Sequence, residues 1–215
     1  MTPETDDRNV VLARIREALG KRRAPIASPL SPEQLGALLP KVVDSLTTFG
    51  KWLEDLGGEF VCCQESELEA VVTRLAGEHG WQRPAIHDFE LIRGAIGSGQ
   101  WSRDALEWEQ SVSAEALERC DVGITGCLAL IAQTGSVLLN TSTAGGRTLS
   151  ILPPHQLVIA RRAQLMEDLP SAMRAALDSG SSMISLHTGP SRTGDIERVL
   201  VLGAHGCLVG QLAMF

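Results

Sequence analysis

The order of helical and strand-like segments is the feature that most constrains how this chain can fold. Apolar side chains recur at helical spacing from Pro40 to Leu56, and two glycines end that helix. A short buried strand follows in GEFVCC, then a helix from Ser66 to Gly80 and a strand at Pro84–His87. Parallel strands need crossover helices of this kind. The order therefore predicts an α/β fold with an open, mostly parallel sheet and flanking helices.

The pattern changes after Cys120, where strand-like segments follow one another closely. Asp121–Thr125 predicts a strand, and CLALIAQ and SVLLN, separated by Thr134 and Gly135, predict a β-hairpin. TSTAGGRT and HTGPSRTGD have the small and polar residues of loops. A strand after two prolines in LPPHQLVIA, a helix that opens near Asp168 and a last strand in HGCLVGQLAMF complete the prediction.

The N-terminal segment differs from the rest of the chain. Asn9–Leu19 places apolar side chains on one helical face, and a linker with three prolines follows. We therefore expect an N-terminal helix and linker over residues 1–31 and a single α/β domain over residues 32–215. Such a helix is typically a packing arm or an oligomer contact, so a homo-oligomer is left open.

Composition and charge narrow the classes of function. The 215 residues, of which 44% are hydrophobic, suit one domain of ordinary size with a real core. The net charge of −7 argues against nucleic-acid binding. The N-terminus shows no signal peptide and no apolar run is long enough to span a bilayer, so we expect a cytoplasmic protein. The five cysteines have no CxxC spacing, which favours buried free thiols over disulfides or an iron–sulfur ligand set.

Three glycine-containing loops carry most of the polar groups that can bind a ligand. In chain order they are Thr134–Gly135, Ala144–Arg147 and His187–Asp195. Each follows a predicted strand, and we expect one cleft because the carboxyl ends of parallel strands gather at one edge of a sheet. The third loop is the richest: Ser191 and Thr193 offer hydroxyls, and Arg192 offers a guanidinium suited to phosphate or carboxylate. The alternatives are a surface turn made of turn-forming residues and, for Arg147, a solvated side chain. The predicted ligand-binding residues are Thr125, Gln133, Thr134, Gly135, Gly146, Arg147, Gly189, Ser191, Arg192, Thr193 and Asp195.

The candidate acid–base residues are His155, Asp195 and His205. A histidine in a cleft can exchange protons near neutral pH, and the alternative is a structural hydrogen-bonding group. No two histidines have the spacing of a metal-binding pair on a helix, so no metal site is predicted. Neither a P-loop nor a G-x-G-x-x-G fingerprint occurs, and no cofactor is predicted.

Motifs in the second half of the chain resemble a known family. GITGCLALIAQTGSVLL, GGRTLSILPPHQLVIA, LHTGPSRTGDIE and GAHG are similar, in content and order, to the LUD (lactate-utilisation) domain of the type found in lactate-utilisation protein C. The resemblance covers Asp121–Phe215 strongly and the N-terminal half in outline. It implies a fold similar to the ribose-phosphate isomerase, glucosamine-phosphate deaminase and CoA-transferase group (NagB/RpiA/CoA-transferase-like). It also implies a role in oxidising L-lactate to pyruvate beside two iron–sulfur partner proteins, which hold the redox centres.

One departure from the family pattern bears on activity. The family usually has Glu where this chain has Gln133, and an amide cannot act as a general base or a nucleophile. Three functions stay open at this point. We favour a non-redox subunit that binds a small anion and docks the iron–sulfur partners. The others are a stand-alone isomerase- or CoA-transferase-like enzyme, with Asp195 or His155 in place of the missing carboxylate, and a purely structural or regulatory module.

Overall fold

A computed structural model describes residues 3–20, 31, 34, 42–87, 90–97, 99, 103–108, 112–189, 192–193, 201–202 and 209–214. By its internal contacts the chain divides into two compact units, residues 1–38 and 39–215. The predicted division at residue 31 stays a prediction. The first unit contains α1 (Pro3–Gly20), which is longer at its N-terminal end than the helix predicted from the apolar pattern. Its apolar side chains, Val10, Val11, Ile15 and Leu19, are exposed.

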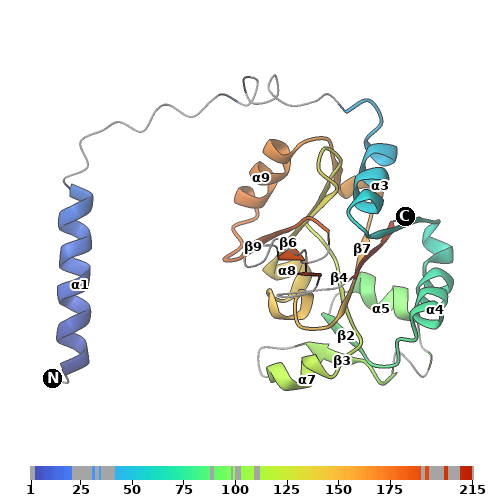
Figure 1. The fold of residues 1–215 in the computed structure, drawn as a ribbon, viewed down its shortest axis with the longest axis horizontal. Helices are drawn as coiled ribbons and strands as arrows, with labels where there is room; N and C mark the ends of the chain where they lie inside the picture. The colour runs from blue at the N-terminus through green and yellow to red at the C-terminus, as the bar shows by residue number, and fades with distance from the viewer. Residues whose placement is uncertain are drawn as a thin grey trace. The chain divides into compact units, whose positions relative to one another are not determined.

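The second unit is organised around a parallel sheet, called sheet A here (Figure 1). All neighbouring strands in it run parallel, which confirms the predicted sheet type. The carboxyl ends of these strands therefore share one edge of the sheet, and the amino ends share the other. In spatial order the strands are β1 (Glu59–Cys62), β12 (Val209–Met214), β7 (His155–Ala160), β4 (Val122–Thr125), β2 (Pro84–His87) and β3 (Leu106–Trp108).

Two helices cover one face of sheet A. They are α4 (Leu68–His79), which continues the short turn η1 (Glu65–Glu67), and α5 (Glu90–Ile96). Because side chains alternate along a strand, β4 and β7 send Ile124 and Leu157 to this face, where they pack on Val72 and Ile92. This is the core expected from the helix–strand order, although α5 and β3 lie in a segment that the sequence left unassigned.

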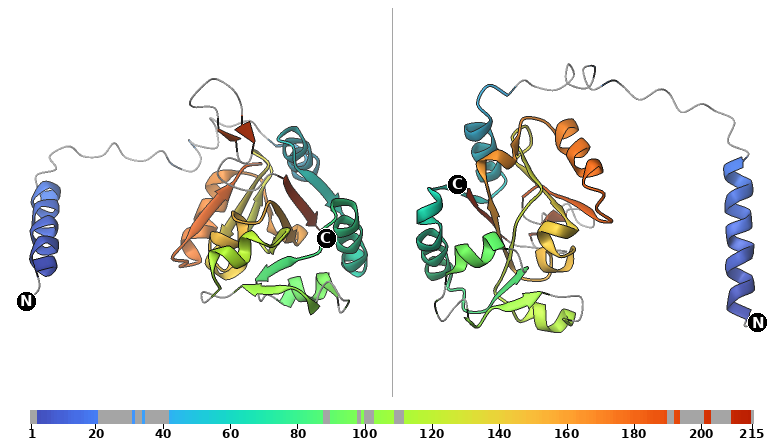
Figure 2. Two further views of the ribbon diagram at one scale, coloured as in Figure 1. Left: turned by 60° about the horizontal axis from the view of Figure 1, so that its bottom comes forward. Right: turned by 180° about the vertical axis from the view of Figure 1, so that it is seen from behind.

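The other face of sheet A carries α3 (Ser45–Asp55) and a second sheet, sheet B (Figures 1 and 2). The predicted hairpin, confirmed as β5 (Ala129–Ile131) and β6 (Ser136–Asn140), lies at the centre of sheet B. It is flanked by β8 (Leu165–Met166) and β9 (Ile184–His187), and α9 (Leu169–Asp178) packs on its outer face. The sequence did not separate these strands from the parallel sheet, because short strands of the two sheets have the same apolar pattern.

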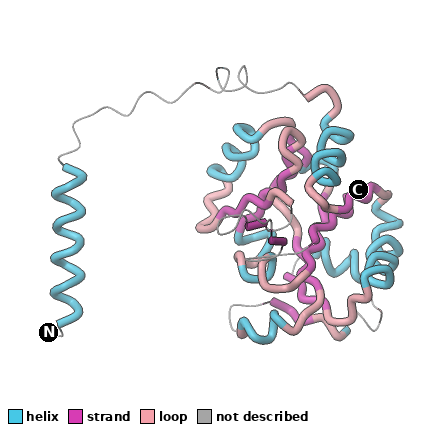
Figure 3. Tube along the Cα trace, viewed as in Figure 1, coloured by secondary structure: helices cyan, strands magenta, loops and turns pink. Residues whose placement is uncertain are grey.

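Several boundaries differ from the predictions for local reasons. The helix predicted from residue 40 begins at Ser45, because the Asp44 carboxylate caps the backbone N–H groups of Leu46 and Thr47. The segment predicted as the loop TSTAGGRT contains α8 (Thr141–Ala144), capped by Asn140. The remaining short elements are α7 (Ala114–Glu118), η2 (Thr148–Ser150), η3 (Arg162–Gln164), β10 (Arg192–Thr193) and β11 (Val201–Leu202) (Figure 3).

Glycine brings β4 and η2 into close contact. A Cβ atom at Gly123 would collide with the backbone carbonyl oxygen of Leu149.

Of the four cysteines whose exposure is described, Cys120 and Cys127 are buried as expected, but Cys62 on the edge strand β1 is exposed. Within the described ranges, no helix has both the length and the apolar character needed to cross a bilayer.

Candidate functional site

Strand direction in sheet B decides which of the three predicted loops meet. Both β5 and β9 run antiparallel to β6, so their carboxyl ends lie at the same end of the sheet. The hairpin turn after β5 therefore meets the residues that follow β9. The hydroxyl of Ser136 lies 2.7 Å from that of Thr134 and 2.8 Å from that of Thr188. The first loop and the start of the third loop are thus joined by a chain of three hydroxyl groups.

The second loop lies at the opposite end of β6. The five residues of that strand span roughly 14 Å. A Cβ atom at Gly145 would lie 2.5 Å from ring carbons of both His87 and Trp108, at the carboxyl ends of β2 and β3. The Trp108 indole N–H also donates to the Gly145 carbonyl oxygen at 3.0 Å. All three loops follow strands of sheet B rather than sheet A. The expectation of one shared cleft relied on parallel strands, and it does not hold for Gly146 and the exposed Arg147 of the second loop.

The glycines of the two joined loops face α3. A Cβ atom at Gly135 would lie 2.6 Å from Cβ of Trp52, and one at Gly189 would lie 2.8 Å from Cβ of Leu56. Both glycines also have positive φ angles, 64° and 73°. Their small size therefore serves the packing of these turns on α3, and Gln133 stands half-buried beside them, with its backbone N–H donating to the Glu167 carbonyl oxygen at 3.1 Å.

A second polar chain connects the two sheets. On β4 and β7, Thr125 and Gln156 point to the face that packs on sheet B, and only 0% and 5% of their surfaces are exposed. The Gln156 amide N–H donates to Thr125 Oγ1 at 3.4 Å, and Gln156 Oε1 lies 3.1 Å from Nδ1 of His187. The other ring nitrogen of His187, Nε2, lies 2.9 Å from Ser185 Oγ. We call these four residues the Thr125–Ser185 relay.

From the hydrogen bonds of the relay we infer which tautomer His187 adopts. Because the Gln156 amide nitrogen is used on Thr125, its oxygen faces the ring and accepts from Nδ1–H. The lone pair of Nε2 is then directed at the Ser185 hydroxyl, which donates to it. Burial lowers the pKa of His187 below its ordinary value of 6.5, so the ring is neutral near pH 7. The result is a hydroxyl group held against an imidazole in its basic form.

His155, a predicted catalytic candidate, lies apart from this relay. It is the first residue of β7 and shares the α4 face of sheet A, where its ring lies 5.6 Å from that of Trp81 and 5.7 Å from that of His79. Burial, with a smaller contribution from His79, lowers its pKa. Its Nδ1 atom is buried and has no hydrogen-bond partner among the described residues. Sheet A thus stands between His155 and the relay.

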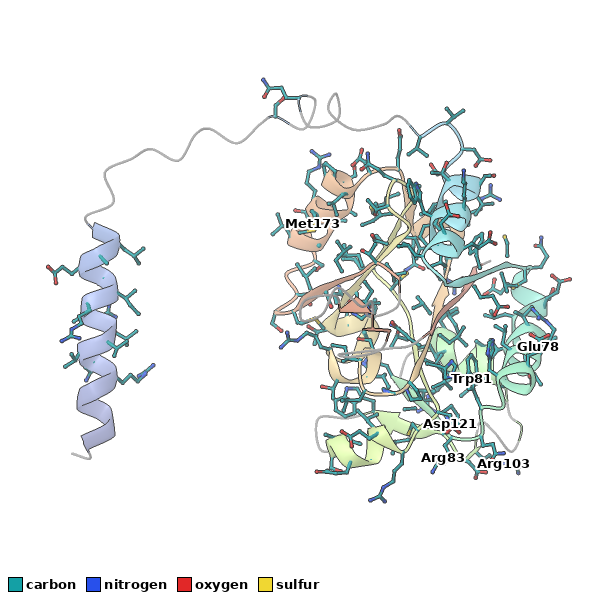
Figure 4. All side chains as sticks on the ribbon, viewed as in Figure 1. Glu78, Trp81, Arg83, Arg103, Asp121 and Met173 are labelled. Carbon is teal, nitrogen blue, oxygen red and sulfur yellow. The ribbon has the colours of Figure 1, made fainter. Side chains whose placement is uncertain are left out.

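The amino edge of sheet A beside His155 is held by ion pairing and backbone hydrogen bonds. The Asp121 carboxylate accepts from the backbone N–H groups of Gln82 and Arg83, each at 2.9 Å, and pairs with the Arg83 guanidinium at 3.3 Å. Figure 4 shows Trp81, Arg83 and Asp121 gathered there. Burial raises the pKa of Asp121, but these bonds outweigh it and the net shift is downward. These contacts fix the strand starts, which is a structural role.

A cavity of about 510 Å³ opens near the carboxyl ends of β1, β2 and β7. Its charged lining consists of Glu65, Glu69, Glu90 and Arg161, and no predicted site residue borders it. Arg161 pairs with Glu65 at 3.4 Å. The excess of carboxylates makes this cavity unsuited to an anion.

Several predictions fall on residues outside the described part of the chain, namely Ser191, Asp195 and His205. For Arg192 and Thr193 the backbone strand β10 is described, paired with β11. Their binding roles stay predictions. Within the described part, no three His, Cys, Asp or Glu side chains group closely enough to hold a metal ion.

Sequence reasoning missed Gln156, Ser185 and the role of His187. A signal was present for each. Gln156 is a polar residue inside the apolar strand HQLVIA, and buried polar side chains require partners. Ser185 and His187 are two residues apart in ISLH, which places both side chains on one face of a strand. What the sequence does not show is that β9 packs against β7.

The comparisons with known proteins agree with this architecture. The model of the LUD domain matches residues 46–208. A crystal structure of a DUF162 family protein from Deinococcus radiodurans superposes with a TM-score of 0.63, covering 79% of this chain and 95% of that one at 20% identity. At that identity the likeness concerns the fold.

Several curated relatives carry the same name. The Lactate utilization protein C of Deinococcus radiodurans is 34% identical over 186 residues, which is 85% of this chain and 80% of that protein. The Lactate utilization protein C of Macrococcus caseolyticus is 35% identical over 115 residues, so in that match the chain spans about half, 49%, of the relative. Since the LUD model matches well over half of the chain, the protein belongs to the LUD-domain family.

Proposed function

We propose that this chain acts in L-lactate utilisation, the oxidation of L-lactate to pyruvate, as a non-redox subunit that binds a small anion and docks iron–sulfur partner proteins. The observation that carries this proposal is the match to proteins named Lactate utilization protein C, one of which aligns with 85% of the chain. Strong similarity over most of a chain is the best support for a shared role when the site itself holds no diagnostic motif.

The cysteines support placing the redox centres on partner proteins. Cys127 lies in the core between the two sheets, and Cys120 belongs to a different apolar cluster beside α7. Burial raises the pKa of Cys127 to about 12, which keeps its thiol protonated. Thiols buried in separate parts of the core do not converge on one iron–sulfur cluster.

The hydroxyl chain of Thr134, Ser136 and Thr188 supports the anion-binding part of the proposal. It brings two loops with polar side chains together at one end of sheet B. Arg192, which supplies the charge, follows Thr188 by four residues. Hydroxyl donors beside a guanidinium suit a carboxylate or a phosphate.

Two measurements test the proposal. Deletion in the native host should impair growth on L-lactate as the only carbon source, and normal growth would contradict the metabolic role. In thermal unfolding, L-lactate or inorganic phosphate should raise the melting temperature of the wild type and of Arg119→Ala, which changes an exposed arginine at the C-cap of α7, but not of Arg192→Ala. A rise retained in Arg192→Ala would contradict the placement of the anion.

The second candidate is a stand-alone enzyme of the isomerase and CoA-transferase group, acting on a phosphorylated or acyl substrate. The Ser185–His187 contact favours it, because a hydroxyl held against a neutral imidazole can undergo proton transfer. Gln133 disfavours the version that uses a carboxylate at the hairpin turn. Turnover of a phosphosugar or an acyl-CoA by the purified protein would support this candidate, and complementation of lactate growth without such turnover would favour the first.

A further inference from the structure

The Thr125–Ser185 relay has the parts of a nucleophilic site. A serine nucleophile needs a base at its hydroxyl and a third group that holds the base in the right tautomer. Here His187 Nε2 lies 2.9 Å from Ser185 Oγ, and Gln156 Oε1 lies 3.1 Å from His187 Nδ1. Thr125 in turn accepts from the Gln156 amide nitrogen, which leaves Gln156 Oε1 facing the His187 ring.

The surroundings of the relay strengthen these contacts. In the β6–β9 pairing, Val137 stands opposite His187 and Leu139 stands opposite Ser185. Both apolar side chains belong to the core between the sheets, which Val158 of β7 completes. Hydrogen bonds in such a medium are stronger than in water, and the neutral imidazole is favoured over the charged one.

The relay also reaches the surface. β9 is an outer strand of the described part of sheet B, whose order is β8-β5-β6-β9. Ser185 and His187 are each partly exposed, whereas Thr125 and Gln156 are buried. The reactive end of the relay is therefore partly open to solvent at this outer strand, where a substrate can reach it, and the orienting end is buried.

We propose that Ser185 is a nucleophile toward acyl groups, with His187 as its general base and Gln156 as the positioning residue. In the first step Ser185 Oγ bonds to the carbonyl carbon of an ester or thioester, and its proton passes to His187 Nε2. The imidazolium gives that proton to the departing alcohol or thiol as the C–O or C–S bond breaks. Water then attacks the acyl-serine by the same proton route, releasing the acid and restoring the hydroxyl.

Gln156 sets a limit on this reactivity. A neutral amide orients the ring but does not stabilise the imidazolium, as a carboxylate would. Gln156→Glu keeps an acceptor for Nδ1–H and supplies that charge, while the Thr125 hydroxyl can reverse and donate to it. This site does not rest on the proposed lactate role, since it uses none of the residues assigned to anion binding except the buried Thr125.

The test uses an alkyl fluorophosphonate, which reports a nucleophilic serine without knowledge of the substrate. Ser185 Oγ forms a bond to phosphorus, the P–F bond breaks, and fluoride leaves with the serine proton. We expect the folded chain to gain one phosphonyl group, mapped to Ser185 by peptide mass spectrometry. Ser185→Ala should lose the label, and Ser182→Ala, at an exposed serine three residues away, should keep it.

The variants separate a reactive relay from a merely structural one. His187→Gln should slow labelling by about 10²-fold or more if the imidazole acts as a base, and Gln156→Glu should label faster than Gln156→Leu. Each variant is compared with the wild type by circular dichroism and thermal unfolding, so that loss of folding is seen directly. No label on Ser185 in the folded wild type, equal labelling of Ser182, or an unchanged rate in folded His187→Gln would overturn the proposal.

Discussion

Replacing Gln156 by leucine tests whether the relay holds the two sheets together. The change keeps the approximate size of the side chain but leaves two partners, His187 Nδ1–H and Thr125 Oγ1, without their hydrogen bonds. Each buried polar group left unpaired costs about 1–3 kcal/mol. The 3.4 Å contact to Thr125 is the weaker of the two, so we expect Gln156→Leu to lower the free energy of unfolding by about 2–4 kcal/mol.

Urea denaturation at pH 7.5, followed by tryptophan fluorescence and circular dichroism, measures this loss as a lower midpoint at unchanged slope. The double variant Gln156→Leu/His187→Leu should be less destabilised than the sum of the single variants, because both ends of one hydrogen bond are removed together. A coupling of about 0.5–3 kcal/mol is typical of residues in contact. If Gln156→Leu stays within about 0.5 kcal/mol of the wild type, the level of a neutral surface change, the relay does not stabilise the sheet contact and this reasoning is refuted.

Three further predictions follow from glycine packing, thiol burial and histidine titration. Gly123→Ala should destabilise the protein by about 1–3 kcal/mol, because its methyl group meets the backbone oxygen of Leu149. The control Gly77→Ala, in open space on α4, should stabilise the protein by about 0.5–1 kcal/mol. Equal effects of the two changes in urea denaturation would contradict the close contact at Gly123. Iodoacetamide at pH 8 should modify the exposed Cys62 in the folded protein, and Cys127 only after unfolding, because burial raises the pKa of Cys127 to about 12. Equal rates of modification of the two cysteines, measured by peptide mapping, would contradict this. Because the folded pKa of His187 lies below the unfolded value of 6.5, the unfolded chain binds the proton first, so stability should be fully present above pH 6.5 and fall as the pH drops toward the folded pKa. His187→Gln should flatten that part of the stability–pH profile, and an unchanged profile would show that another group causes it.

The fold could be predicted as far as local pattern determines it. The hairpin of β5 and β6 was predicted because a Thr-Gly turn separates two short apolar runs. The parallel sheet followed from the alternation of helices and strands. Membership of a strand in one sheet or the other could not be predicted, because β6 and β7 have similar apolar content and differ only in their distant partners.

The proximity of two of the three loops could be predicted, and the binding role of their residues stays a prediction. Thr134 and the residues after β9 were expected to meet, and the hydroxyls of Thr134, Ser136 and Thr188 do. The expectation that Arg147 would join them overlooked a consequence of the predicted hairpin: an antiparallel β6 carries the loop that follows it away from the turn that precedes it. Gln156 escaped notice because a polar side chain in an apolar strand indicates that a partner exists without identifying it.

The strands of sheet B come from two separate segments of the chain, each of which follows a strand of sheet A. The segment after β4 supplies the inner strands β5 and β6, and the segment after β7 supplies β8 and β9, which flank them on both sides. During synthesis, the edge of β5 therefore stays unpaired until β8 emerges, about 25 residues after β6, and the edge of β6 stays unpaired until β9 emerges, about 45 residues after β6. Gln156 and His187 are 31 residues apart in the chain, so they become neighbours only when β9 pairs with β6.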